Sequence, residues 1–280
     1  MPELPEVQVL VSYLQQALPG RKIVDVDVRR EKSIRPNSPS ELIAGLQGHR
    51  FERVERRAKY LIFHLKHGRQ HQRLLGHLGM TGRLYIQPKQ EELPKHTALA
   101  LELDKGRFVF EDTRYFGRIS LDLSALDKLG PEPLSDAFQV ATFHTGLKRS
   151  RQAIKVRLLA TDLVVGVGNI YASEALHRAR INPRTPACRL SKKRVERLHA
   201  AIRATLEEAI QLGSTLPLDW AGKNRGDQLF YFGREKSGKS FEERFRVYGR
   251  EGEPCQTCSM PIRRLVQAAR STFFCPKCQT

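Results

Sequence analysis

Near its C-terminus the chain reads CQTCSMPIRRLVQAARSTFFCPKC, residues 255–278. It contains two C-x2-C pairs with sixteen residues between them, and each pair can give two thiolates to one metal from a tight turn. Two such pairs across a hairpin complete a tetrahedron, so the spacing predicts one structural Zn²⁺ and a rigid hairpin over 259–274. The predicted ligands are Cys255, Cys258, Cys275 and Cys278. Such a closed site has no open position for a substrate, so we expect no catalytic cofactor.

Two disulfide bonds or four free thiols are the alternatives to a zinc site. Disulfides are disfavoured in an intracellular chain, and Met1 leads into a Pro- and Glu-rich start rather than a basic and then apolar leader. The fifth cysteine, Cys188, lies outside the set and is expected to be an ordinary buried thiol. The predicted hairpin carries Arg263, Arg264 and Arg270, whose guanidinium groups can grip phosphate oxygens in pairs.

Upstream of the finger the sequence has a helical pattern. Apolar residues recur with helical spacing over 149–161, 170–179 and 191–212, with a short glycine-containing connection at 164–169. The segment 213–250 is polar, rich in Gly, Lys and Arg, and has little period, which predicts a long mobile loop.

The first half of the chain has the pattern of antiparallel β-structure. An amphipathic helix over 3–18 ends at Pro19-Gly20, and polar and apolar residues then alternate with the period of a strand. The predicted strands are 24–29, 60–65, 83–86, 97–103, 107–112 and 118–123. Turn signals such as Asp104-Lys105-Gly106 join them, and the spacing is too short for crossover helices, so we expect a sandwich or barrel.

The charge of the chain favours a polyanionic partner. It has 48 Lys and Arg against 30 Asp and Glu, a formal charge of +18 spread along the whole length. A generically basic surface is the alternative. The composition, 40% hydrophobic and 28% charged, is that of a chain that folds in water, and no segment approaches the ~20 apolar residues of a membrane helix. We therefore expect a cytoplasmic protein with no membrane partner.

The chain begins MPELPE, and removal of the initiator methionine would expose the secondary amine of Pro2. An α-amino group titrates near ~8, so a useful fraction is an unprotonated nucleophile at neutral pH. Its attack on a sugar C1′ gives an iminium ion that acidifies the neighbouring C–H and allows phosphate to be eliminated. Glu3 beside the amine is the candidate proton shuttle. The alternative is that Glu3 and Glu6 only cap the first helix.

Seven motifs occur in order along the chain, and together they resemble the bacterial formamidopyrimidine-DNA glycosylase family. The motifs are MPELPEV at 1–7, RRAKYL at 56–61, HLGMTG at 77–82, DTRYFGR at 112–118, GPEPL at 130–134, VVGVGNIYASEAL at 164–176 and the four-cysteine finger. The resemblance implies a β-sandwich domain followed by a helix-two-turns-helix domain with a zinc hairpin. It also implies excision of oxidised purines such as 8-oxoguanine and formamidopyrimidines from double-stranded DNA, with cleavage at the abasic site by β,δ-elimination.

The resemblance assigns catalytic roles to four residues. Pro2 corresponds to the Schiff-base nucleophile, and Glu3 corresponds to the catalytic acid. Lys59 in RRAKYL corresponds to the proton donor of β-elimination, and Arg270 in ARSTFFC to the arginine linked to the second elimination. Without the resemblance, Lys59 and Arg270 would be solvated surface cations.

A second set of residues is implied to contact DNA. Met80, Arg114 and Phe116 correspond to the trio that enters the duplex and fills the gap left by the flipped nucleotide, although Met80 and Phe116 taken alone would be core residues. The turn 164–169 corresponds to a phosphate-binding turn in which Asn169 donates its amide and the N–H groups opening the next helix favour an anion; a plain glycine-rich connection is the alternative. Further backbone contacts are implied for His96, Arg151 and Lys155.

The chain also departs from the family pattern. Tyr115 stands where the family usually has a second arginine, Thr113 stands where proline is common, and the segment 213–250 is longer and more basic than usual. Two other functions stay open: a relative of the endonuclease VIII type that prefers oxidised pyrimidines, and a non-catalytic zinc-hairpin DNA-binding protein. Leu4 and the trio of predicted wedge residues fit the purine type better.

We therefore predict an α+β, multidomain and monomeric protein. Its expected domains are a catalytic β-sandwich at 1–130, a helix-two-turns-helix DNA-binding domain at 135–225 and a zinc finger at 245–280. The linker is placed at Gly130-Pro131-Glu132-Pro133, because two prolines in four residues suit neither a helix interior nor a central strand.

Overall fold

The computed structural model describes residues 2–214 and 245–280, and the chain divides into two compact units. Of the described residues, Pro2 and Glu6–Asp127 belong to unit 1, whereas Glu3–Pro5, 128–214 and 245–280 belong to unit 2. Most of the loop expected at 213–250 lies outside the described residues.

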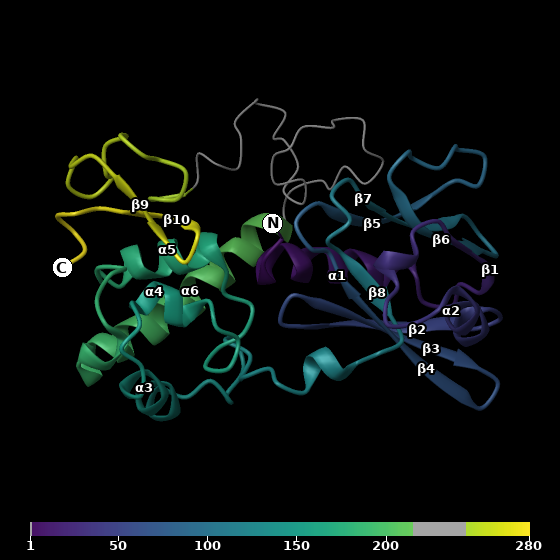
Figure 1. Ribbon diagram of the computed structural model, residues 1–280, viewed down its shortest axis with the longest axis horizontal. Coiled ribbons are helices and arrows are strands. Elements are labelled where there is room, and N and C mark those ends of the chain that lie inside the picture. The colour runs from purple at the N-terminus through teal and green to yellow at the C-terminus, as the bar shows by residue number, and fades with distance from the viewer. Residues whose placement is uncertain (1, 215–244) are drawn as a thin grey trace. The chain divides into compact units, whose positions relative to one another are not determined.

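Unit 1 contains two antiparallel four-stranded sheets (Figure 1). One sheet has the order β1-β6-β7-β5, with β1 (Ile23–Val28), β5 (Gly82–Gln87), β6 (Thr97–Leu103) and β7 (Arg107–Asp112). The other has the order β2-β3-β4-β8, with β2 (Arg50–Arg57), β3 (Tyr60–His67), β4 (Gln70–His77) and β8 (Arg118–Ser120). The helical segments are α1 (Leu4–Ala17), α2 (Pro39–Leu46), η1 (Glu31–Ser33) and η2 (Ser124–Leu126).

Aromatic rings from both sheets meet in the core of unit 1. The ring of Phe108 on β7 lies 6.0 Å from that of Phe51 on β2 and 5.6 Å from that of Phe63 on β3, both edge to face. Such pairs add about 0.5–1.5 kcal/mol each to the area that they bury. Helix α1 buries Leu10 and Leu14 on the predicted apolar face. The expected N-terminal helix and antiparallel sandwich are confirmed.

Two strands and one α-helix of unit 1 have no counterpart in the sequence prediction. Strand β2 reads RFERVERR and buries only Phe51 and Val54, and β4 reads QHQRLLGH and buries only 74–76, so neither alternates strictly. Both strands are held by β3, which pairs with them along its length. Helix α2 was missed although a reciprocal capping box between Ser38 and Glu41 marks its start.

Helices build most of unit 2, with a two-stranded hairpin near the C-terminus (Figure 1). They are α3 (Val140–Lys148), α4 (Ile154–Leu158), η3 (Ala187–Arg189), α5 (Asn169–Arg178) and α6 (Lys192–Ser214). The helices expected at 170–179 and 191–212 are confirmed to within two residues at each end. In the two described ranges no helix is long and apolar enough to cross a membrane.

The helix expected over 149–161 is wrong, because this range begins after α3 has ended and contains only the short α4. Before α4 the backbone pairs with a distant segment: the N–H of Ile154 donates to the carbonyl of Thr185, and the N–H of Ala187 donates to the carbonyl of Gln152, both at 2.8 Å. Local periodicity carries no information about such long-range bonds.

The predicted zinc hairpin is confirmed as β9 (Arg263–Gln267) and β10 (Arg270–Phe274), an antiparallel pair. Its two turn residues, Ala268 and Ala269, have φ of 47° and 58°. Glycine or asparagine usually fills such positions, because a Cβ is strained in the left-handed region.

Candidate functional site

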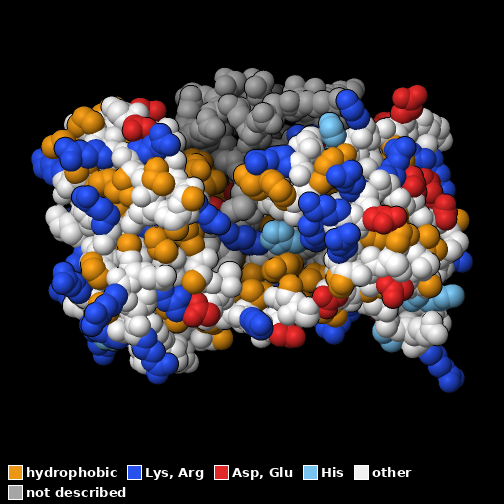
Figure 2. All heavy atoms as spheres, in the orientation of Figure 1, with side chains coloured by type: hydrophobic (Ala, Val, Ile, Leu, Met, Phe, Trp, Pro, Cys, Tyr) orange, Lys and Arg blue, Asp and Glu red, His pale blue; other side chains and the backbone are white. Residues whose placement is uncertain are grey.

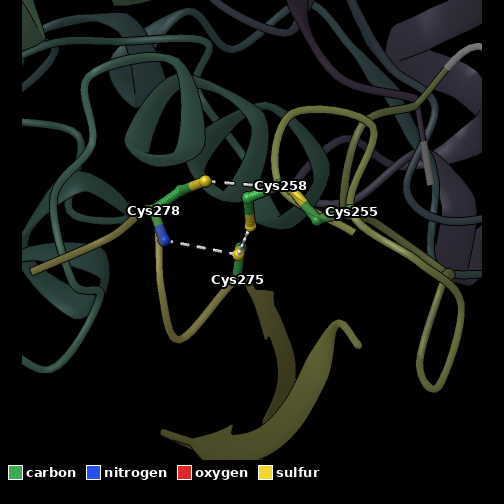
Figure 3. Close-up of side chains that lie close together, drawn as sticks. All are labelled: Cys255, Cys258, Cys275 and Cys278. Carbon is green, nitrogen blue, oxygen red and sulfur yellow. Dashed lines mark hydrogen bonds between the residues drawn. The ribbon is translucent and has the colours of Figure 1, made fainter. Parts of the chain in front are cut away.

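The four cysteines of the finger point toward one another (Figure 3). All four Sγ atoms lie within 4.8 Å of one another; Cys255 and Cys278 are 3.9 Å apart and Cys258 and Cys275 are 3.4 Å apart. Thiolates bound tetrahedrally at ~2.3 Å from zinc lie about 3.8 Å apart, so the donor set fits Zn²⁺. The five cysteines of the chain all lie in described segments and are free thiols, which excludes the two disulfides in this structure.

The metal site is packed against α5 and a small apolar cluster. Val247, Ile262 and Phe273 are buried around the cysteines. His177 on α5 is 5% exposed, and its Nε2 lies 3.6 Å from the Sγ of Cys255. A metal ligand held by an outer hydrogen bond in this way is fixed in orientation. Cys188, expected to be buried, is instead half-buried and lies outside the cluster.

The carboxylate of Glu3 lies at the N-terminus of α5. It accepts hydrogen bonds from the backbone N–H groups of Gly168 (2.8 Å), Ile170 (2.9 Å) and Tyr171 (3.3 Å), and Glu3 is 1% exposed. Glu3 therefore caps the N-terminus of α5. These N–H groups were expected to hold a phosphate, but in this structure the anion that they bind is the Glu3 carboxylate.

A close backbone approach brings the Glu3 segment to this turn. The N–H of Leu4 donates to the carbonyl of Gly166 at 3.2 Å, and Gly166 has φ of 78°. A Cβ on Gly166 would lie 2.4 Å from Cδ1 of Leu4, so only glycine fits here. The glycine-rich connection therefore has a definite packing role beside the expected one of admitting a phosphate.

Lys155, for which a contact with the DNA backbone is predicted, is buried in unit 2. It is 1% exposed, and its Nζ donates to Oδ1 of Asn169 (2.7 Å), the carbonyl of Ser271 (2.9 Å) and Oγ1 of Thr272 (2.8 Å). The side-chain amide of Asn169 in turn donates to the same Ser271 carbonyl at 3.0 Å. Lys155 therefore ties the start of α5 to strand β10 of the zinc hairpin.

Two predicted site residues, Glu3 and Arg270, lie within electrostatic range of Lys155 in unit 2. Burial lowers the pKa of Lys155 to about 8; the carboxylate of Glu3 opposes this fall and the guanidinium of Arg270 adds to it. Glu3 and Arg270, far apart in sequence, thus act on one buried ammonium group. Arg270 itself is exposed at the first position of β10.

The remaining predicted catalytic residues group with unit 1. Pro2 is buried, and Lys59 is half-buried in the turn between β2 and β3, directly after Ala58 with its φ of 54°. Burial, with the charges of Lys59 and Arg118, lowers the pKa of His77 to about 4. His77 is therefore neutral at neutral pH.

The predicted wedge residues are exposed, so the reading of Met80 and Phe116 as core residues is wrong. Met80 is 40% exposed and Phe116 is 52% exposed. The guanidinium of Arg114 lies 5.0 Å from the centroid of the Phe116 ring. An exposed aromatic residue, methionine and arginine on neighbouring loops are a surface suited to contact a partner.

Asp112 fixes the shape of the wedge loop, residues 113–117. The sequence analysis predicts no role for this aspartate. It is fully buried, and its carboxylate accepts from Oγ1 of Thr81 (2.5 Å) and from the N–H groups of Arg114 (3.1 Å) and Gly117 (2.7 Å). An aspartate that opens a loop and bonds the backbone two residues on is a known turn signal, so the sequence did offer a clue.

A second buried carboxylate outside the prediction is Glu174 on α5. It accepts from the backbone N–H groups of Arg246, Val247 and Tyr248 at 2.9, 3.0 and 2.9 Å. Burial raises the pKa of Glu174, and these backbone groups oppose the rise. The three backbone partners of Glu174 are about 72 residues away in the chain, so the sequence around Glu174 could not predict this role.

Exposed cations are spread over the surface of each unit (Figure 2). Among the predicted backbone contacts, Arg151 is exposed, whereas His96 is half-buried beside Tyr115. On the hairpin, Arg263 and Arg264 are exposed, and Nε of Arg264 donates to Oγ of Ser271 at 3.0 Å.

Three family models match consecutive parts of the chain. They are the formamidopyrimidine-DNA glycosylase N-terminal domain over residues 1–119, the formamidopyrimidine-DNA glycosylase H2TH domain over 129–217, and a zinc finger found in FPG and IleRS over 252–280. With the sandwich, the helical unit and the cysteine cluster, these matches define the class of the chain as a zinc-finger DNA glycosylase with an associated abasic-site lyase activity.

Similar proteins cover the whole chain. The formamidopyrimidine-DNA glycosylase of Desulfitobacterium hafniense is 38% identical over 288 residues, with all of both chains covered. The structure of Lactococcus lactis Fpg with abasic-site DNA is 30% identical, with a TM-score of 0.86 and 99% of each chain covered. A structure of MutM with DNA containing carbocyclic 8-oxo-G is also 30% identical, with a TM-score of 0.86 and full coverage of both chains. This chain belongs to the formamidopyrimidine-DNA glycosylase family.

Proposed function

We propose that this enzyme excises oxidised purines, 8-oxoguanine and formamidopyrimidines, through a Schiff base on Pro2. Once Met1 is removed, the Pro2 nitrogen attacks C1′ of the damaged nucleotide, the bond from C1′ to the base breaks, and the base leaves with a proton. The C1′–O4′ bond then breaks, O4′ takes up a proton, and the opened sugar is left joined to Pro2 as an iminium ion. Loss of a C2′ proton from this iminium ion expels the 3′ phosphate, and a second elimination expels the 5′ phosphate. Atoms and electrons balance without any redox cofactor.

The observation that carries the proposal is the buried Glu3 carboxylate. Three backbone N–H groups fix it at the N-terminus of α5, and Glu3 follows Pro2 directly in the chain. An acid adjacent to the amine and held rigidly can pass a proton to the opening sugar and take it back. We assign Glu3 this proton-shuttle role.

The two cations complete the proposed lyase. Lys59 is assigned the proton donation of the first elimination, and Arg270 is assigned the binding of phosphate in the second. Support for Arg270 comes from its exposure and from the tie between β10 and α5 through Lys155, which holds its strand beside the Glu3 carboxylate. A guanidinium group can bind two oxygens of a departing phosphate at once.

The substrate is proposed to be double-stranded DNA with an oxidised base or an abasic site, bound by a monomer. Met80 and Phe116 would fill the space left by the flipped nucleotide and Arg114 would contact the orphaned base, which their exposure supports. Exposed Arg151 and the amide of Asn169 would contact the backbone. The structures of relatives with abasic-site and 8-oxo-G DNA support the same choice. Acting on chromosomal DNA would place the enzyme in the cytoplasm.

The domains proposed for this function are the catalytic domain at 1–130, the helix-two-turns-helix domain at 135–225 and the zinc finger at 245–280. A division of this kind lets separate surfaces supply the wedge, the phosphate contacts and the hairpin.

Borohydride trapping on abasic-site DNA tests the nucleophile. The mature protein is expected to become covalently joined to the DNA. A variant with one extra residue before Pro2 is expected to lose trapping, because its terminal amine is displaced, while Pro2→Gly keeps some trapping through its primary amine. The proposal fails if the extended protein traps DNA as well as the mature one. A panel of duplexes with single oxidised purines or pyrimidines then ranks the lesions.

A further inference from the structure

Tyr115, in the middle of the wedge loop, lies between a cation and a histidine of unit 1. The guanidinium carbon of Arg30 is 4.7 Å from the centroid of the Tyr115 ring. The His96 ring is 6.1 Å away at 64°, with its Nδ1 3.4 Å from the Tyr115 hydroxyl. The backbone of Tyr115 is also fixed: its φ is 53°, and its carbonyl accepts from Nη1 of Arg118 at 3.3 Å.

The stacking leaves the edge of the Arg30 guanidinium available to an oxyanion. Arg30 is exposed, and none of the carboxylates in the described ranges pairs with it, whereas its neighbour Arg29 lies 3.8 Å from Asp27. A guanidinium that covers one face with an aromatic ring still presents its N–H groups in the plane. That edge matches two oxygens of one phosphate.

His96 can present a second donor to the same anion. If the Tyr115 hydroxyl donates to Nδ1, the neutral imidazole carries its proton on Nε2, on the other side of the ring. Arg30 and His96 thus flank Tyr115 with donors, and Tyr115 itself lies between the wedge residues Arg114 and Phe116.

We propose that Arg30, Tyr115 and His96 form a phosphate subsite that binds one backbone phosphodiester next to the wedge. Arg30 is the charged ligand, Tyr115 is its stacking platform, and the His96 imidazole is the second donor. Tyr115 stands where the family pattern has an arginine, and Arg30, in the segment between β1 and η1, restores a guanidinium to this loop. The proposal rests on the proposed function, because it needs DNA against the wedge loop.

Salt dependence of DNA binding tests the charged ligand. Affinity for a duplex with a tetrahydrofuran abasic analogue is measured by fluorescence anisotropy between low and physiological salt. Loss of one phosphate contact is expected to weaken binding about three- to tenfold and to reduce the slope of log K against log salt by about 0.9. We expect this for Arg30→Gln. The matched control is Arg29→Gln, which removes an equal charge that is already paired and should leave the slope unchanged.

A backbone scan identifies the phosphate itself. Neutral methylphosphonates are placed one at a time near the lesion. At the contacted position the substitution should weaken the wild type several-fold and leave the affinity of Arg30→Gln unchanged. The subsite is refuted if no position behaves in this way, or if Arg29→Gln and Arg30→Gln have equal slopes. If Arg30→Gln does not fold, Arg30→Lys replaces it; this variant should keep the slope and lose affinity.

A double-mutant cycle tests the platform. In a Tyr115→Leu background, Arg30→Gln should have a smaller effect on affinity than in the wild type, because the guanidinium is no longer held. Equal effects in both backgrounds would overturn the role of Tyr115. Borohydride trapping at saturating DNA should be the same for the wild type and the control Arg29→Gln. If the wild type itself does not trap, the proposed function fails, whereas the salt and methylphosphonate results still decide whether the subsite exists.

Discussion

Replacing Lys155 by methionine removes a buried ammonium group together with its three hydrogen bonds, at 2.7, 2.9 and 2.8 Å. The variant leaves three acceptors without this donor, at about 1–3 kcal/mol each. It also removes an unfavourable charge, because burial lowers the pKa of Lys155 from 10.5 to about 8, equivalent to about 3 kcal/mol. At neutral pH the two effects partly cancel, so the loss of stability should be modest there.

The pH dependence separates the two effects. A lowered lysine pKa means that the unfolded chain binds the proton more tightly, so wild-type stability should rise as the pH increases from about 8 to about 10.5. The difference in unfolding free energy between wild type and Lys155→Met should therefore grow by about 2 kcal/mol between roughly pH 7 and 9.5.

Urea unfolding at several pH values measures this difference. The matched control is Lys148→Met, which removes an exposed lysine that donates one bond to the Cys188 carbonyl at 2.9 Å. The change in its difference from the wild type over this window is the reference against which the growth for Lys155→Met is judged. A flat difference for Lys155→Met as well would show that the ammonium is not held in a desolvated site, and the tie between α5 and β10 would need another explanation.

Three further changes test other parts of the site. Asp112→Ala should cost about 3 kcal/mol in urea unfolding, because buried N–H groups lose their acceptor; a loss below about 0.5 kcal/mol would contradict the role. His177→Phe should speed transfer of zinc to a chelator about tenfold or more, since it removes the imidazole that is hydrogen-bonded to Cys255; an unchanged rate would refute that contact. Ala269→Gly, at φ of 58°, should relieve about 1 kcal/mol of strain and slow amide hydrogen exchange in the hairpin; faster exchange would refute the strain.

Local patterns predicted the parts of the molecule that are decided locally. The spacing of Cys255, Cys258, Cys275 and Cys278 fixed one ligand set, because a C-x2-C turn brings two thiolates together whatever surrounds it. The period-two sequence pattern likewise predicted β6 and β7. Strands β2 and β4 were not predicted, because pairing with β3 determines which of their residues are buried and their own sequences have no regular period.

Long-range contacts account for what the sequence could not predict. The carboxylate of Glu3 meets the N–H of Gly168 across 165 residues, and nothing near either position indicates the partner. The exposure of Phe116 and the burial of Lys155 run against the usual preference of each residue type, since large apolar residues tend to be buried and lysine is almost never fully buried. The exposure of Phe116 and the burial of Lys155 both depend on neighbouring residues that the folded chain brings close.

Helix α5 connects the buried Lys155 and the Glu3 carboxylate with the zinc site. Its N-terminus binds the Glu3 carboxylate, its first residue Asn169 is bonded to Lys155 and β10, and His177 near its other end contacts the zinc ligand Cys255. A metal that fixes the hairpin therefore also fixes the turn at which Glu3 is held. Because these bonds are buried or partly buried, a change at the zinc site should alter the position of the Glu3 carboxylate without any direct contact between metal and substrate.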